Sequence, residues 1–111
     1  MDKMDKIIKL TNEAYTFAKQ AHNMCFDDLD TGRPEDTTLA LAYAASCTSK
    51  YAAAAAIYLS DPDLENEDVA ALLRQFEVFT SEIRAVHEQR KRVKVNICVE
   101  LEYLYDLLKR I

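Results

Sequence analysis

The chain has 111 residues and a formal net charge of −5, and half of its residues are hydrophobic. This length and composition predict one globular domain over residues 1–111 and argue against a disordered chain. The negative charge disfavours a general nucleic-acid binder. No apolar run approaches the roughly 18 residues of a membrane span, and the first residues lack the apolar core of a signal peptide, so we expect no membrane association.

Residues that form turns are scarce, because the chain has one glycine and two prolines. Few reversals in this length mean long elements, and long elements in globular proteins are helices. We therefore expect an all-α fold. The predicted architecture is an antiparallel bundle of three long helices, of which the last covers about residues 66–111.

The three cysteines, Cys25, Cys47 and Cys98, are an odd number with no Cys-x-x-Cys spacing. We expect these cysteines to be buried, reduced thiols in a reducing compartment. The expected location of the protein is therefore the cytoplasm. A disulfide framework and a thiolate metal site remain alternatives.

The first predicted helix covers residues 2–29. Its apolar side chains recur in steps of three and four residues, which predicts one buried face. These side chains are Ile7, Leu10, Ala14, Phe17, Ala18, Ala21, Met24, Cys25 and Leu29. His22 lies at the border between the polar and apolar faces, so we expect it at the rim of the core. Gly32 is suited to end this helix and Pro34 to begin the next.

The second predicted helix covers residues 34–60 and contains the alanine-rich run LALAYAASCTSKYAAAAAIYL. Alanine is the best helix former, and small or apolar side chains occupy almost every side, which predicts a helix buried nearly all round. Tyr43, Tyr51 and Tyr58 stand on related turns of it. They are expected to be core aromatics with hydroxyls at the rim, and the alternative is a tyrosine-lined ligand pocket.

The last segment, residues 66–111, contains neither glycine nor proline. A heptad seam runs along it, interrupted by one arginine, and resumes one step out of register after residue 97. The seam consists of Val69, Leu72, Phe76, Phe79, Ile83, Val86, Arg90, Val93 and Ile97, and then Leu101, Leu104, Leu108 and Ile111.

Two structures fit this seam. One helix of about 45 residues would be roughly 68 Å long and would need a second chain to cover it. A break near residues 88–96 would instead give a four-helix bundle. The absence of a helix breaker slightly favours the unbroken or kinked helix. A third reading is a strand over residues 93–101, where apolar and polar residues alternate, although no second strand is predicted to pair with it.

Motifs for catalysis, metals and cofactors are not found in the sequence. The residues three positions before His22 and His87 are Lys19 and Arg84, so the Glu-x-x-His pairs of di-iron bundles are missing. One glycine excludes a phosphate-binding P-loop, and the residues around Gly32 do not fit a calcium loop. We predict no catalytic residue, metal or cofactor, and we favour a non-enzyme over an enzyme.

A basic cluster near the predicted break is the clearest candidate binding surface. If the helix is continuous, its positive side chains share one stripe with a histidine between them. The stripe comprises Arg84, His87, Arg90, Lys91 and Lys94. We expect these charges to be solvated or paired with the acidic turns, and in a four-helix bundle they would lie beside the first acidic turn. An acidic partner protein and nucleic acid are the alternatives.

These observations favour a small non-enzymatic helical-bundle protein. It would act through self-association, as a homodimer, and through contact with a protein partner. One alternative is an RNA-processing or nuclease-like factor with a composite site around Arg84, His87 and Arg90. The other is a small-ligand sensor with a pocket lined by Tyr43, Tyr51 and Tyr58.

Overall fold

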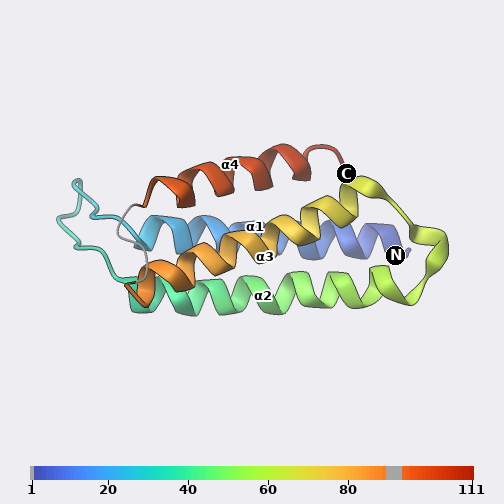
Figure 1. Cartoon of the computed structure of the whole chain (residues 1–111), viewed down its shortest axis with the longest axis horizontal. Helices are drawn as coiled ribbons and strands as arrows, with labels where there is room; N and C mark the ends of the chain where they lie inside the picture. The colour runs from blue at the N-terminus through green and yellow to red at the C-terminus, as the bar shows by residue number, and fades with distance from the viewer. Residues whose placement is uncertain (1, 90–93) are drawn as a thin grey trace.

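The computed structural model describes residues 2–89 and 94–111, which form an all-helical bundle and confirm the predicted fold class. The four helices are α1 (Lys3–Met24), α2 (Thr37–Ser60), α3 (Glu67–His87) and α4 (Val95–Leu108), with one short 3-10 turn, η1 (Pro62–Leu64). Figure 1 shows α2 along one side of the bundle, α4 along the opposite side, and α1 and α3 between them.

Polar side chains fix where three of the helices begin. The carboxylate of Asp2 accepts a hydrogen bond from the amide of Asp5 at 2.8 Å, and Asp36 accepts one from Leu39 at 2.9 Å. The Asn66 side chain likewise accepts hydrogen bonds from amides in the first turn of α3. These acceptors satisfy amide groups that have no partner inside the helix, so short local signals set the helix starts.

The core is built from large side chains on α3 and small ones on α1 and α2. Fully buried members from α3 include Leu72, Phe76, Phe79 and Ile83. The buried faces of α1 and α2 are mostly alanine, at Ala14, Ala18, Ala21, Ala40, Ala44 and Ala54. Small side chains let two helix backbones approach closely, and α1 makes its most extensive packing with α2.

The second helix is not buried nearly all round, contrary to the sequence expectation. Its buried residues are Ala40, Ala44, Cys47 and Ala54, which lie on the side facing α1 and α3. The alanines on the outer side are exposed. The expectation was wrong because alanine is apolar and an excellent helix former, yet its small surface costs little when it is left in water.

The last segment folds back on itself, so the slight preference for one unbroken helix was wrong. The bundle measures 47 × 26 × 21 Å, and α4 returns alongside α3 and α1 (Figure 1). The helix α3 ends at His87 with left-handed backbone at Gln89, where φ is +60°. The amides of Glu88 and Gln89 bond back to α3 carbonyls, which closes its end without glycine.

The segment that alternates like a strand is helical where the structure describes it. Val95, the first residue of α4, begins a helix that continues to Leu108. The fully buried Ile97 and Leu104 lie seven residues apart on its inner face, which is a helical spacing. A lone strand would have left its backbone groups unpaired, and the helix satisfies them internally.

The backbone at Gln89 predicts an unusual response to glycine. We expect Gln89→Gly to raise the free energy of unfolding by about 0.5–1 kcal/mol, because a left-handed conformation costs a residue with a Cβ and not glycine. Glu88→Gly is the matched control, because Glu88 has ordinary negative φ and glycine there should lower the free energy of unfolding by about 1 kcal/mol. Urea unfolding followed by circular dichroism measures both. One continuous helix would instead be destabilised by both substitutions.

Candidate functional site

A loop of residues 25–36 joins α1 to α2 at one end of the bundle. The Asp28 amide donates a hydrogen bond to the Arg33 carbonyl at 2.7 Å, and Gly32 makes the reversal with a φ of +75°. The Asp28 carboxylate accepts a hydrogen bond from the Thr31 amide at 3.3 Å. The backbone and side chain of Thr31 are the main reason that the pKa of Asp28 is lowered. This acidic loop is therefore an ordered element, and its hydrogen bonds favour the ionised form of Asp28.

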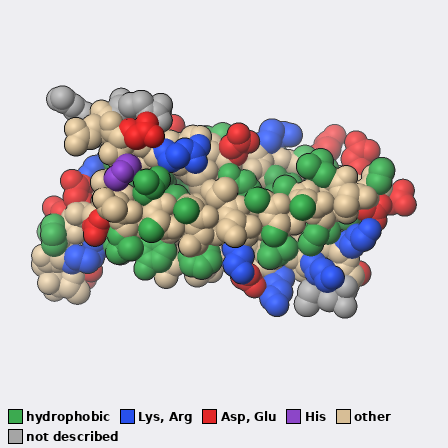
Figure 2. All heavy atoms as spheres, turned by 90° about the horizontal axis from the view of Figure 1, so that it is seen from below, with side chains coloured by type: hydrophobic (Ala, Val, Ile, Leu, Met, Phe, Trp, Pro, Cys, Tyr) green, Lys and Arg blue, Asp and Glu red, His purple; other side chains and the backbone are tan. Residues whose placement is uncertain are grey.

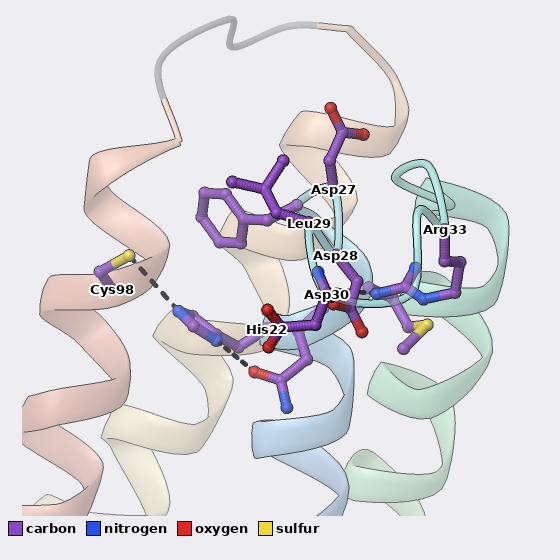
Figure 3. Close-up of a pocket in the computed structure, with 10 residues that line it drawn as sticks. His22, Asp27, Asp28, Leu29, Asp30, Arg33 and Cys98 are labelled. Atoms are coloured by element: carbon purple, nitrogen blue, oxygen red, sulfur yellow. Dashed lines mark hydrogen bonds between the residues drawn. The ribbon is translucent and has the colours of Figure 1, made fainter.

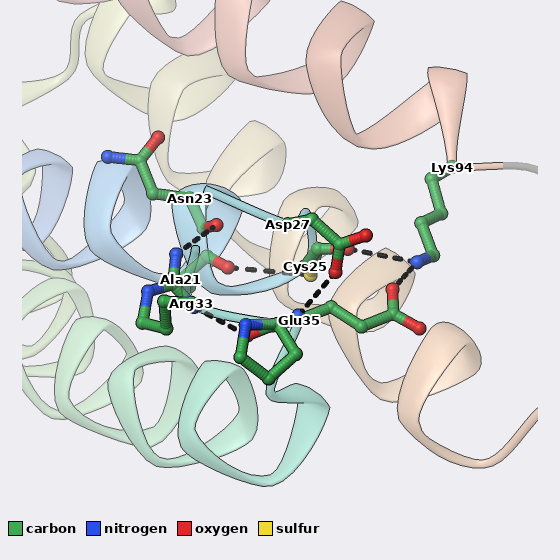
Figure 4. A network of polar contacts seen from close by, with 8 residues as sticks. Ala21, Asn23, Cys25, Asp27, Arg33, Glu35 and Lys94 are labelled. Atoms are coloured by element: carbon green, nitrogen blue, oxygen red, sulfur yellow. Dashed lines mark hydrogen bonds and ion pairs between the residues drawn. The ribbon is translucent and has the colours of Figure 1, made fainter. Parts of the chain in front are cut away.

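Lys94, at the start of α4, ties that helix to the acidic loop. Its ammonium group donates to the backbone carbonyl of Cys25 at 3.0 Å and forms an ion pair with Glu35 (Figure 4). The loop is also held internally, because Asp27 accepts a hydrogen bond from the Glu35 amide at 2.7 Å. The pairing of a basic residue with the first acidic turn, expected for a four-helix bundle, is confirmed for Lys94.

A hollow of about 710 Å³ opens beside the acidic loop (Figure 3). Asp27, Asp28 and Asp30 supply its acidic lining, and Phe26 and Leu29 supply apolar surface. Several carboxylates around one concave surface create a negative potential, which raises the local concentration of cations. The hollow is thus suited to a small molecule that has both a positive charge and an apolar part.

Three polar side chains form a chain of contacts in the wall of this hollow. The Sγ atom of Cys98 lies 3.4 Å from Nε2 of His22, and Nδ1 of His22 lies 3.0 Å from Oδ1 of Asn23 (Figure 3). An amide oxygen can only accept, so Nδ1 carries the proton and Nε2 is left to accept from the thiol. A thiol, an imidazole and an orienting amide are the groups that activate a sulfur nucleophile.

The two other cysteines have different surroundings. Cys25 and Cys47 are buried, whereas Cys98 is partly exposed. Burial raises the pKa of Cys25 to about 11, with Lys94 acting in the opposite direction, and it raises the pKa of Cys47 to about 12. Both buried groups therefore remain protonated thiols at neutral pH, and Cys98 alone combines access to solvent with a base.

The predicted basic stripe does not form on one helix. Arg84 and His87 lie on α3, whereas Lys94 lies on the far side of the reversal and is engaged with the acidic loop. Arg90 and Lys91 are outside the described residues. Nδ1 of His87 is buried and has no hydrogen-bond partner within the described part of the chain. The described residues thus bring only Arg84 and His87 onto a common helix.

The three tyrosines of α2 have separate environments. Tyr51 stacks on Phe76 with ring centroids 5.5 Å apart, and Tyr43 packs against the same core. The Tyr58 hydroxyl bonds to the backbone of Asn66 at the start of α3, at 3.3 Å. Tyr51 and Tyr58 line a small groove of about 250 Å³ between α2 and α3, and Tyr43 is not part of its lining.

The pairing of His22 with Cys98 was not predicted from the sequence. The two residues are 76 positions apart, and each was assigned separately, one as a rim histidine and the other as a buried thiol. Their contact depends on α4 folding back over α1. The one available signal was the position of each residue beside the buried face of its helix. Cys98 follows the buried Ile97, and His22 follows the buried Ala21.

No protein-family model matches the chain, and no curated protein or solved structure is significantly similar to it. Across residues 2–89 and 94–111, no three histidine, cysteine or acidic side chains are placed to hold a metal ion. In the same residues, no helix has both the length and the apolar character needed to cross a membrane.

Lys94 provides a test of how α4 is held. We expect Lys94→Met to lower the free energy of unfolding by about 1 kcal/mol, because the Cys25 carbonyl loses a charged donor. Lys109→Met is the control, since Lys109 forms an exposed ion pair with Asp106 at 3.6 Å and should change stability by less than about 0.5 kcal/mol. Urea unfolding and hydrogen exchange of the α4 amides measure the effect. Equal losses in the two variants would show that Lys94 does not hold α4.

Proposed function

We propose that this chain is a small non-enzymatic helical-bundle protein that acts through self-association, as a homodimer, and through contact with a protein partner. The observation that carries the proposal is a heptad pattern on the outer side of α2. The positions alternate in steps of four and three residues, and all are exposed. We call them the outer seam: Thr38, Ala42, Ala45, Ser49, Ala52, Ala56 and Leu59.

The outer seam has the spacing of a helix-pairing surface. Heptad positions stay on one side of a helix, so they can all meet the same partner helix. Small side chains at these positions let the second helix approach closely. Figure 2 looks onto the α2 side, where hydrophobic side chains are spread along the middle of the molecule and charged ones lie mainly toward its edges and ends.

A second copy of the chain is the occupant that the outer seam fits best. The seam is centred near Ser49, so two antiparallel copies related by a two-fold axis would place Ala42 opposite Ala56 of the other copy. Leu59 is 79% exposed at one end of the seam, and in this arrangement it would pack over Thr38 of the second copy. Each copy would thus cover the large apolar side chain that the other leaves in water.

The charges of α2 are compatible with this pairing. Lys50 is the one charged residue of α2, and it bonds to Glu13 of α1 at 2.8 Å, away from the seam. Pairing of two α2 helices would therefore bring no like charges from α2 together at the contact. The unpaired cysteines Cys25, Cys47 and Cys98 support a reducing, cytoplasmic location as part of the same proposal.

A cross-linking experiment tests the two-fold arrangement. In a Cys98→Ser background, we expect Ser49→Cys to form an intermolecular disulfide under mild oxidation, because the two Ser49 positions would face each other near the axis. Ser81→Cys is the matched control, since Ser81 is an exposed serine on α3 outside the seam. Non-reducing electrophoresis reads the result. Equal cross-linking of both variants would contradict a specific seam.

A charge placed in the seam should separate the two copies. The chain mass is 12.7 kDa, and we expect light scattering to give twice this value for the unmodified protein and 12.7 kDa for Ala52→Glu. Each copy would then place an unpaired carboxylate in the contact, and an unpaired charge is costly to bury. Thr16→Glu, at an exposed position on α1, is the control and should remain dimeric. An unmodified protein that stays at 12.7 kDa at about 100 μM would overturn the proposal.

A further inference from the structure

We propose that Cys98 is a site of covalent modification, where His22 accepts the thiol proton and the sulfur attacks a small electrophile whose positive end lies against the aspartates of the hollow. The proposal goes beyond self-association, because it concerns the opposite side of the bundle from the outer seam. It rests on three features of the described residues: the pairing of thiol and imidazole, the orienting amide, and the acidic hollow that they face.

The first feature is the contact between Cys98 and His22. With Sγ and Nε2 3.4 Å apart, the thiol can pass its proton directly to the imidazole. The ring is held on two sides, by Oδ1 of Asn23 at 3.0 Å and by the Phe26 ring, whose centroid is 5.1 Å away. A base whose second nitrogen is fixed keeps the correct tautomer and orientation for this transfer, as in other thiol–imidazole sites.

The second feature is the placement of both groups at helix ends of opposite polarity. Cys98 lies in the first turn of α4, which has no side-chain cap, and His22 lies in the last turn of α1. The N-terminal end of a helix favours a negative group and the C-terminal end favours a positive one. Moving the proton from Cys98 to His22 therefore places each charge at the helix end that stabilises it.

The third feature is the acidic lining, which defines the electrophile. Asp27, Asp28 and Asp30 border the same hollow as Cys98, and hydrogen bonds from Thr31 lower the pKa of Asp28. Arg33 also lines the hollow, where it donates to the backbone carbonyls of Pro34 and Asn23 and its charge helps to lower the pKa of Asp28. Three carboxylates thus outnumber one guanidinium in the lining. A reagent with a positive charge should therefore reach the thiol faster than an anionic reagent of the same reactivity.

The chemical step is a simple displacement. The Sγ–H bond of Cys98 breaks and the proton moves to Nε2 of His22. The freed electron pair on sulfur forms a bond to the electrophilic atom, and the leaving group departs with the electron pair of the bond that breaks. With a methanethiosulfonate reagent, a mixed disulfide forms and methanesulfinate leaves, so the reagent itself is the oxidant.

Two methanethiosulfonates test the proposal, one with a trimethylammonium group and one with a sulfonate group. We expect one label per folded chain, at Cys98, because Cys25 and Cys47 are buried. Relative to a free cysteine peptide, the ratio of the cationic to the anionic rate constant should be at least about tenfold higher, and His22→Gln should slow both reactions about tenfold. Mass spectrometry locates the label and stopped-flow absorbance gives the rates.

Matched variants separate this site from a merely structural contact. Asp30→Asn should reduce the preference for the cationic reagent. Asp63→Asn is the matched control, because the amide of each residue donates to a preceding aspartate at 3.0 Å, and it should leave this preference unchanged. If His22→Gln fails to fold by circular dichroism, Asn23→Ala at an exposed position should still slow labelling about threefold. The proposal would be overturned if Cys98 reacted at the rate of the free cysteine peptide and none of these substitutions changed that rate.

Discussion

The reversal of the chain between α3 and α4 is the constraint on which the rest of the structure depends. Because α4 returns along the bundle, it covers α1 and α3 and leaves the outer side of α2 without a neighbouring helix among the described residues (Figure 1). The same reversal brings Lys94 to the acidic loop and Cys98 to His22. A left-handed residue, Gln89, ends α3 at the point where glycine would normally be found.

Small side chains give α2 two different faces. Its inner alanines allow close packing against α1, while the large side chains that fill the core come mainly from α3. Its outer alanines repeat the same helical spacing toward solvent. One helix can therefore support both the bundle and the proposed pairing of two copies, since close approach needs small residues and a heptad spacing on either face.

Much of the fold was predictable from local signals, whereas the reversal and the candidate site were not. The heptad positions from Val69 to Val86 are buried as predicted, because periodicity reports which side of a helix faces a core. Periodicity does not report whether the same chain or another covers that side, and Gln89 carries no sequence signal for a helix end. His22 and Cys98 meet only through tertiary packing, so their spacing of 76 positions could not reveal the pair.

The most direct test of this account is whether α4 lies against α1 of the same chain. The Tyr15 and Tyr105 rings have centroids 6.2 Å apart, which places some of their protons within reach of a nuclear Overhauser effect. We predict a cross-peak between the two rings in a spectrum of labelled chains diluted into an excess of unlabelled chains. In such a sample, a cross-peak between two labelled rings reports a contact within one chain. If the Tyr15–Tyr105 cross-peak were absent from this spectrum and were seen only between chains, the reversal after α3 would be contradicted. That result would support a continuous helix paired across two copies.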